Sequence, residues 1–431
     1  MKKQPRILIF TVTSWNSKVG ANTWETLLEG YPSEKLANIC IRDEQPDSNV
    51  CARYFRISEN RIIKSIINPS MKTGVEVTQK EQLNDRDLIE HNQRYQFMRK
   101  HRRFSMLMLR ELVWKLRKWK TKELNEFLDD FKPDIILHSM EGYIHLNRII
   151  QYTIQRTRAK VIGYFWDDNF TYKQSNKIGH KVYRYFQRKS LNDLVRNTDG
   201  FFAISAMTKE EADCFWGIRS VVLTKPFYHH SDEITEEMGN PISMIYTGNL
   251  LIGRAHSLKR LVEVVKKEFN SKFKIEVYTN MALVDELKNL SDNRICTIHL
   301  PVSQNEVLKL QRRADVVLFL EDIDGADALV PRLSFSTKIT DYLSSGKCIL
   351  AIGNKDTAPM QYFRENQSAL IASSDEEIKM CLEKLLNSEE EIKEITKNAA
   401  TCAKKWHDPE KVKDTFWKEI YRVYNGKIGA L

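Results

Sequence analysis

Short apolar runs alternate with longer amphipathic stretches along most of the chain. The runs are rich in β-branched and aromatic residues and are too short for helices, so they predict buried strands. They lie at Ile7–Val12, Ile135–Leu137, Lys160–Phe165 and Gly200–Ile204 in the first half, and at Ser243–Tyr246, Phe273–Tyr278, Cys296–Leu300, Asp315–Leu320 and Cys348–Ile352 in the second. Strands that alternate with helices form parallel sheets, so the pattern predicts an α/β protein.

The chain is long enough to build this pattern twice. Its 431 residues are more than a single hydrophobic core ordinarily organises. We therefore predict two doubly wound, Rossmann-like domains that face a cleft, over residues 1–225 and 240–409. The polar segment 225–241 between them carries proline and glycine and has no apolar period, as expected of a linker. Residues 410–431 predict an amphipathic helix with these residues on one face: Val412, Phe416, Ile420 and Val423.

Composition narrows the class of protein. The seven cysteines form no Cys-x-x-Cys pair, which favours a reduced, cytoplasmic protein over a disulfide framework or a zinc site. The longest apolar runs have the length of strands, and the N-terminal run is too short for a signal peptide, so we expect neither a transmembrane helix nor a leader. A formal net charge of +10 favours anionic partners.

The segment "STKITDYLSSGKCILA", residues 336–351, predicts a short helix that leads into a buried strand. Ser336 or Thr337 is expected to cap the helix start, and Gly346 suits its end. The free N–H groups of the first turn, together with Lys338, are suited to an anion. The alternative is a capped helix whose role is packing alone.

A second anion-suited loop opens the second half of the chain. A strand ends at Tyr246, Gly248 and Asn249 follow, and Arg254 precedes or begins a helix. Glycine lets the backbone approach a phosphate closely, and arginine grips phosphate oxygens with two donors. Because the carboxyl ends of parallel strands meet at one edge of a sheet, both loops predict a nucleoside diphosphate site. The alternative is an ordinary turn between strand and helix.

Residues 130–425 carry several motifs in the same order as a known protein family. The Gly248 loop, "FFAISAMTKEEADCFW" at 201–216, "STKITDYLSSGKCILA", and "KKWHDPEKVKDTFWKEIYRVY" at 404–424 together resemble the GT-B glycosyltransferases, in particular their retaining, family-4-like group. The resemblance implies that the second domain binds a nucleotide sugar and that the first domain handles the acceptor. It also implies that the terminal helix, residues 410–431, packs back on the first domain.

The resemblance assigns donor-binding roles to several residues, and the sequence also departs from the family's pattern at some of these positions. Asp341 takes the place of the second of two glutamates that the family spaces eight residues apart, and Leu333 stands in the first place. Asn249 stands where an arginine is usual, so Arg254 is expected to supply the charge for the diphosphate. The predicted donor-binding residues are Gly248, Asn249, Arg254, Glu321, Asp322, Ser336, Thr337, Lys338 and Asp341.

Catalytic candidates follow two predicted strands of the first domain. His138 ends one of them, and the resemblance places a histidine of this loop near the donor sugar and the acceptor. Glu141 follows it, and Asp167 and Asp168 end the next strand, where a carboxylate can orient hydroxyl groups or act as a base. The alternatives are a structural histidine and carboxylates that cap a helix or a solvated turn.

Acidic residues also follow the strand that ends at Leu320. Glu321 and Asp322 begin this loop, and Asp322-x-Asp324 has a spacing that other glycosyltransferases use for a metal. Here the motif follows a strand of a different type of domain from the one in which those glycosyltransferases bind a metal with it. We therefore expect an acidic loop over the donor sugar, and we predict no metal and no cofactor.

Residues 93–120 carry ten Lys and Arg residues against one acid, Glu111. Apolar residues recur at helical spacing there, and Trp114 and Trp119 lie among the basic residues. A basic amphipathic helix with tryptophans predicts contact with an anionic membrane surface. The alternatives are a core helix with a solvated basic face and a nucleic-acid site, although no nucleic-acid motif accompanies the segment.

Together these features predict a metal-independent glycosyltransferase. We expect it to move a sugar, with retention, from a UDP- or GDP-linked donor to a glycan or polyprenyl-linked glycan in cell-surface polysaccharide synthesis. Its expected place is the cytoplasm, at the inner face of the plasma membrane. The rival interpretations are a nucleotide-sugar epimerase of the same fold and a non-catalytic protein that binds sugar nucleotides or glycans.

Overall fold

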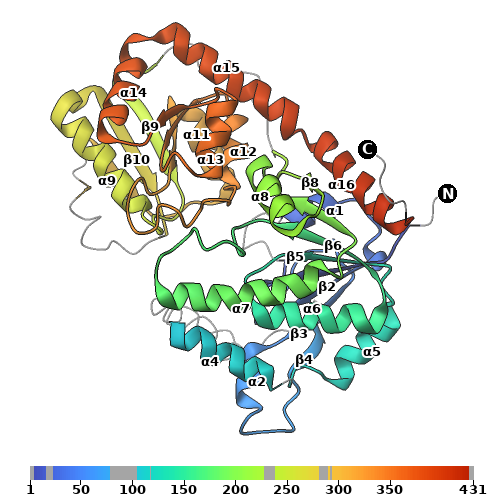
Figure 1. Ribbon diagram of the computed structural model, residues 1–431. Helices are drawn as coiled ribbons and strands as arrows, with labels where there is room; N and C mark the ends of the chain where they lie inside the picture. Colours follow the sequence, from blue (N-terminus) through green and yellow to red (C-terminus); the bar gives the residue numbers. More distant parts are fainter. Residues whose placement is uncertain are drawn as a thin grey trace. The chain divides into compact units, whose positions relative to one another are not determined.

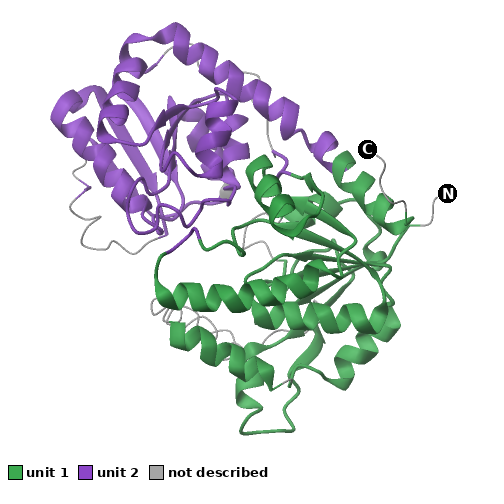
Figure 2. Ribbon diagram, viewed as in Figure 1, with its two compact units in different colours: residues 1–172, 176–223, 414–431 green, residues 173–175, 224–413 purple. Residues whose placement is uncertain are grey.

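A computed structural model describes residues 4–15, 23–77, 104–116, 118–227, 238–280, 290–291 and 294–426 (Figure 1). The chain divides into two compact units (Figure 2). Unit 1 consists of residues 1–172, 176–223 and 414–431, and unit 2 of residues 173–175 and 224–413.

Unit 1 is built on one sheet with the strand order β4-β3-β2-β1-β5-β6-β7-β8. Its strands are parallel except for β4, which pairs antiparallel with β3 at one edge. The strands are β1 (Ile7–Thr11), β2 (Leu36–Cys40), β3 (Arg53–Ile57), β4 (Gly74–Val77), β5 (Ile135–Ser139), β6 (Lys160–Phe165), β7 (Gly200–Ala203) and β8 (Ser220–Val222). The described helices are α1 (Thr23–Leu28), α2 (Glu59–Lys64), α4 (Phe104–Lys115), α5 (Lys122–Phe131), α6 (Ile144–Thr157), α7 (Ile178–Val195) and α8 (Ala206–Trp216).

Unit 2 contains a parallel sheet with the strand order β11-β10-β9-β12-β13-β14. Its strands are β9 (Ile242–Thr247), β10 (Phe273–Tyr278), β11 (Cys296–His299), β12 (Val316–Leu320), β13 (Cys348–Ile352) and β14 (Leu370–Ala372). Its helices are α9 (Arg254–Val264), α11 (Gln304–Arg313), α12 (Lys338–Leu343), α13 (Ala358–Glu365), α14 (Asp375–Asn387) and α15 (Glu389–Trp406), and α16 (Pro409–Tyr424) begins here. The side chains of β12 and β13 are buried along their whole length, as the continuous apolar runs predict.

In both sheets the order in which strands are added reverses at the first strand. In unit 1 the chain runs from β1 outward through β2 and later returns to the other side of β1 with β5. In unit 2 it runs from β9 outward through β10 and returns to the other side of β9 with β12. Ligands of doubly wound sheets bind at the carboxyl ends of the strands beside such a switch point. The predicted fold class, two Rossmann-like α/β domains, is confirmed.

The C-terminal helix α16 joins the two units in sequence, because residues up to Lys413 belong to unit 2 and later residues to unit 1. Its apolar face is buried, at Val412, Phe416, Ile420 and Val423. The ring of Phe416 lies 6.0 Å from that of Trp24 and 5.8 Å from that of Phe202 between ring centroids. The end of the chain therefore completes the core of unit 1.

Candidate functional site

The switch point of the unit 2 sheet is lined by an arginine and a glutamate. Arg254 opens α9, and Glu321 follows β12, the strand beside β9. The guanidinium donates to both carboxylate oxygens of Glu321, over 3.1 and 2.8 Å, and to the side-chain oxygen of Asn249 over 3.0 Å. Burial would lower the pKa of Arg254, but Glu321 outweighs burial and holds that pKa above its usual value. Arg254 is therefore a fixed positive charge.

Lys338 brings a second positive charge to the same loop. Its Nζ donates to the hydroxyl of Tyr246 over 3.4 Å and lies 4.5 Å from the centroid of the Tyr246 ring. Gly248 has a φ of +137°, and a Cβ there would lie 2.0 Å from Lys338 Nζ. Only glycine fits this position. Burial, and next the charge of Arg254, lower the pKa of Lys338 to about 8.

The start of α12 is held by a residue that the sequence did not single out. Lys225 is buried, and its Nζ lies 3.6 Å from a carboxylate oxygen of Asp341 and donates to the carbonyl of Thr337 over 3.3 Å. Lys225 is the first residue of the predicted linker, and only the tertiary fold brings it to α12. Leu333, at the place of the family's first glutamate, is fully buried and supplies no polar group.

The predicted cap of α12 is only partly present. The Ser336 hydroxyl accepts from the Lys338 N–H over 3.4 Å, but the Thr337 side chain makes no cap hydrogen bond. The helix has six residues, so its dipole is weak. The described side chains, more than the helix N-terminus, therefore carry the charge of this site.

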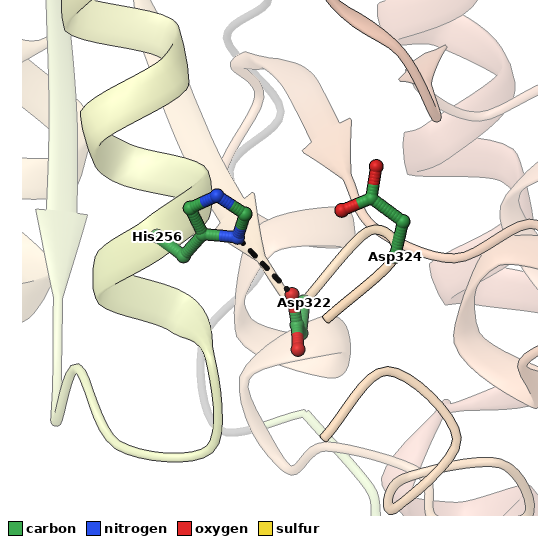
Figure 3. Close-up of side chains that lie close together, drawn as sticks. All are labelled: His256, Asp322 and Asp324. Carbon is green, nitrogen blue, oxygen red and sulfur yellow. Dashed lines mark ion pairs between the residues drawn. The ribbon is translucent and has the colours of Figure 1, made fainter. Parts of the chain in front are cut away.

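The acidic loop after β12 is held in place from within the protein. Oxygens of Asp322 accept from the N–H groups of Gly325 and Asp327, each over 3.2 Å. Figure 3 shows His256, Asp322 and Asp324, whose ligand atoms lie within 4.8 Å of one another. Arg260 donates to Asp324 over 2.9 Å, so a metal ion would compete with a guanidinium. The absence of a metal stays a prediction.

In unit 1, His138 lies inside the sheet. It is the fourth residue of β5, between β1 and β6, and is fully buried. Its Nδ1 lies 3.1 Å from the carbonyl of Ser139, which can only accept, so Nδ1 carries the proton. Burial lowers the pKa of His138 to about 4, so the imidazole is neutral at physiological pH. Its catalytic role stays a prediction.

Asp168 shapes the loop after β6. It is fully buried and accepts from the N–H of Thr171 over 2.8 Å and from the Thr171 hydroxyl. These bonds hold the loop in place, and because the next helix, α7, begins only at Ile178, they are not those of a helix cap. A catalytic role of Asp168 stays a prediction. Its neighbour Asp167 is exposed.

Glu141 and Asp167 follow neighbouring strands, β5 and β6, near the switch point of the unit 1 sheet. Burial, and next the charge of Asp167, raise the pKa of Glu141 to about 7, while Arg42 opposes this. Arg42 follows β2 and was not predicted as a site residue. A carboxyl group that titrates near neutral pH is suited to act as a general base.

The basic segment, residues 93–120, differs from its prediction in the burial of its tryptophans. Residues 93–103 and Arg117 lie outside the described residues. Trp114 and Trp119 are 0% and 3% exposed, so the prediction that they anchor the protein at a membrane surface is wrong. Trp114 stacks on His145 and its indole N–H donates to Glu59, so its apolar ring is buried and its polar atom is paired.

Comparisons with known proteins agree with this architecture. Residues 256–417 match a family model described as "Glycosyl transferase-like". The structure of Anabaena HepE in complex with UDP and glucose superposes with a TM-score of 0.61 at 11% identity, over 97% of this chain and 100% of that one. That of α,α-trehalose 6-phosphate synthase from Burkholderia multivorans gives 0.58 at 8% identity, over all of both chains. The chain has the GT-B fold.

A third similar structure is longer than this protein. A variant of S. aureus TarM, in complex with fondaparinux, α-GlcNAc-glycerol and UDP, gives a TM-score of 0.50 at 10% identity over 70% of this chain. The match covers 58% of TarM, so the chain spans little more than half of that length. No curated protein matches the chain by sequence. Within the described residues, no helix combines the length and the hydropathy needed to cross a membrane.

Proposed function

We propose that this protein is a glycosyltransferase that uses a nucleoside diphosphate sugar as its donor. The observation that supports this most is the pair of partly buried cations, Arg254 and Lys338, at the Gly248 loop. Glu321 compensates only one of the two charges. A partly buried excess of positive charge next to the backbone of Gly248 suits a diphosphate.

In the proposed reaction, Arg254 and Lys338 stabilise the charge that develops on the leaving diphosphate. Each such donor contributes roughly 3 kcal/mol to transition-state stabilisation in other enzymes. Asp341, which Lys225 holds in place, binds the ribose hydroxyls. Arg254 also keeps Glu321 and Asn249 beside the donor. Because Arg254 and Lys338 neutralise the diphosphate, no metal ion is required in this proposal.

We assign the acceptor to unit 1. Glu141, flanked by Asp167 and Arg42, orients the acceptor hydroxyl and takes its proton. The proposed acceptor is a glycan or a polyprenyl-linked glycan of the cell surface, the proposed outcome is retention, and the proposed place is the inner face of the plasma membrane. His138 keeps its proposed role near the donor sugar.

UDP is the first nucleotide to test, because the HepE and TarM structures hold it. A thermal-shift screen with UDP, GDP, ADP and CMP identifies the base. A specific nucleotide at a hundredfold excess over its Kd adds about 2.7 kcal/mol to stability. Incubation with matching nucleotide sugars then separates the rivals: transfer or donor hydrolysis supports the proposal, an epimerised product supports an epimerase, and binding without turnover supports a binding protein. Failure of all four nucleotides to stabilise the protein would contradict the proposal.

A further inference from the structure

Helix α4 presents three leucines to solvent. Leu109, Leu112 and Leu116, the last one residue past the helix end, are 61%, 58% and 54% exposed. Their spacing places them on one face of the helix. Exposed leucines in a row are costly unless something covers them.

The opposite side of α4 is firmly attached to unit 1. The Arg110 guanidinium lies 2.6 Å from a Glu59 carboxylate oxygen, and Trp114 donates to the same carboxylate over 3.1 Å. Glu111 is buried against His145, 2.8 Å away. Because these polar contacts fix the rotation of α4, the helix cannot turn its leucines inward without breaking a partly buried ion pair and a buried hydrogen bond.

Helix α7, which contacts α4, also carries exposed apolar residues. Ile178 is 80% exposed, and Val182 and Tyr185 of the same helix face are also exposed. The two helices contact each other, since the Tyr183 hydroxyl donates to Glu111 over 3.4 Å and Phe104 packs at Gly179 (Figure 1). We name these six residues the α4–α7 face: Leu109, Leu112, Leu116, Ile178, Val182 and Tyr185.

The surroundings of the α4–α7 face are positively charged. Lys115, Lys181 and Lys189 are exposed on the two helices. The acid of α4, Glu111, is buried, and the acid of α7, Asp193, lies close to that helix's C-terminal end. Apolar residues interspersed with lysines are typical of helices that lie in the headgroup layer of an anionic bilayer.

We propose that the α4–α7 face docks unit 1 on an anionic membrane surface. The leucines enter the headgroup layer, and the lysines contact the lipid phosphates. A second copy of the chain is a poorer occupant, because a two-fold contact would bring two lysine-bearing faces together. This inference rests on the proposed function for its purpose, which is to bring the enzyme to a lipid-linked acceptor.

The test is flotation with vesicles of phosphatidylcholine alone or mixed with phosphatidylglycerol. The wild-type protein should float with the anionic vesicles at low salt and much less with the neutral ones, and added salt should weaken binding. Replacing Leu109, Leu112 and Leu116 together with serine should weaken binding about a hundredfold or more, since this removes apolar burial without changing charge. Lys181→Gln with Lys189→Gln should weaken it about fivefold per lysine.

The matched control replaces two exposed apolar residues of unit 2, Leu300 and Met380, with serine. It should float like the wild type, and all variants should keep the wild-type melting temperature. Unchanged flotation of the triple leucine variant would overturn the proposal, as would a wild-type protein that ignores anionic vesicles or that self-associates through the leucines. Nucleotide binding is measured separately, so a protein that floats without binding any nucleotide would contradict the proposed function alone.

Discussion

At the scale of single residues, Lys338 links the charge of the proposed donor site to pH. Burial and the neighbouring Arg254 lower its pKa to about 8, so it loses its proton within an accessible pH range. A bound diphosphate would favour the charged form and raise that pKa. We therefore expect UDP affinity to be constant between about pH 7 and 8, where the terminal phosphate is ionised, and to fall above about pH 8 by up to tenfold per pH unit.

Calorimetric titration of UDP at several pH values measures this dependence. Lys338→Gln should bind UDP more weakly and without the alkaline loss, because the titrating group is gone. An alkaline loss that persists in Lys338→Gln would assign it to another group.

Glu141 gives a second prediction at this scale. With a pKa of about 7, raised by burial and then by Asp167, it is active as a base only after it loses its proton. The value of kcat/KM should therefore rise with pH up to about 7, level off, and fall above about pH 8, where loss of the Lys338 proton weakens donor binding. Asp167→Asn should move this rise to lower pH, because it removes a repelling charge, and Arg42→Gln should move it to higher pH.

The control for this profile is UDP affinity, which should be unchanged in Glu141→Gln while kcat falls by about a hundredfold or more. A Glu141→Gln variant with wild-type turnover, or a rise that neither neighbour shifts, would remove Glu141 from the mechanism.

At the scale of elements, α16 shows how a distant segment stabilises unit 1. Phe416 is fully buried against Trp24 and Phe202. Phe416→Ala should reduce the free energy of unfolding of unit 1 by about 3–5 kcal/mol, the usual cost of such a cavity. Denaturant unfolding followed by tryptophan fluorescence measures it, with the exposed Lys418→Ala as control. Equal stability of the two variants would show that α16 is not part of this core.

The elements also show what the sequence could and could not predict. The strands β12 and β13 were predictable, because a short, continuous apolar run has few ways to be buried. The orientation of α4 was not. It carries leucines and a tryptophan on different sides, so periodicity alone cannot decide which side faces the core. The ion pair between Arg110 and Glu59 decides it, and those residues are far apart in sequence.

At the scale of the whole molecule, the alternation of strands and helices was enough to predict two doubly wound units and the strand ends that carry the site. Arg254 and Lys338 were singled out because each lies in a motif within a single loop, but their contacts with Glu321 and Tyr246 were not predicted. Lys225 and Arg42 were missed for the opposite reason. Each acts on a residue of another element, and no local pattern marks such a long-range contact.

The central claim is that Arg254 and Lys338 form a diphosphate site at the Gly248 loop, and calorimetric titration of UDP tests it most directly. Lys338→Ala and Arg254→Ala should each weaken binding by roughly 1.5–3 kcal/mol, the range for hydrogen bonds to charged groups. The exposed Lys259→Ala, on the same helix as Arg254, should bind like the wild type. Saturable binding that both site variants lose supports the account. UDP affinity that stays the same in all three variants would contradict it.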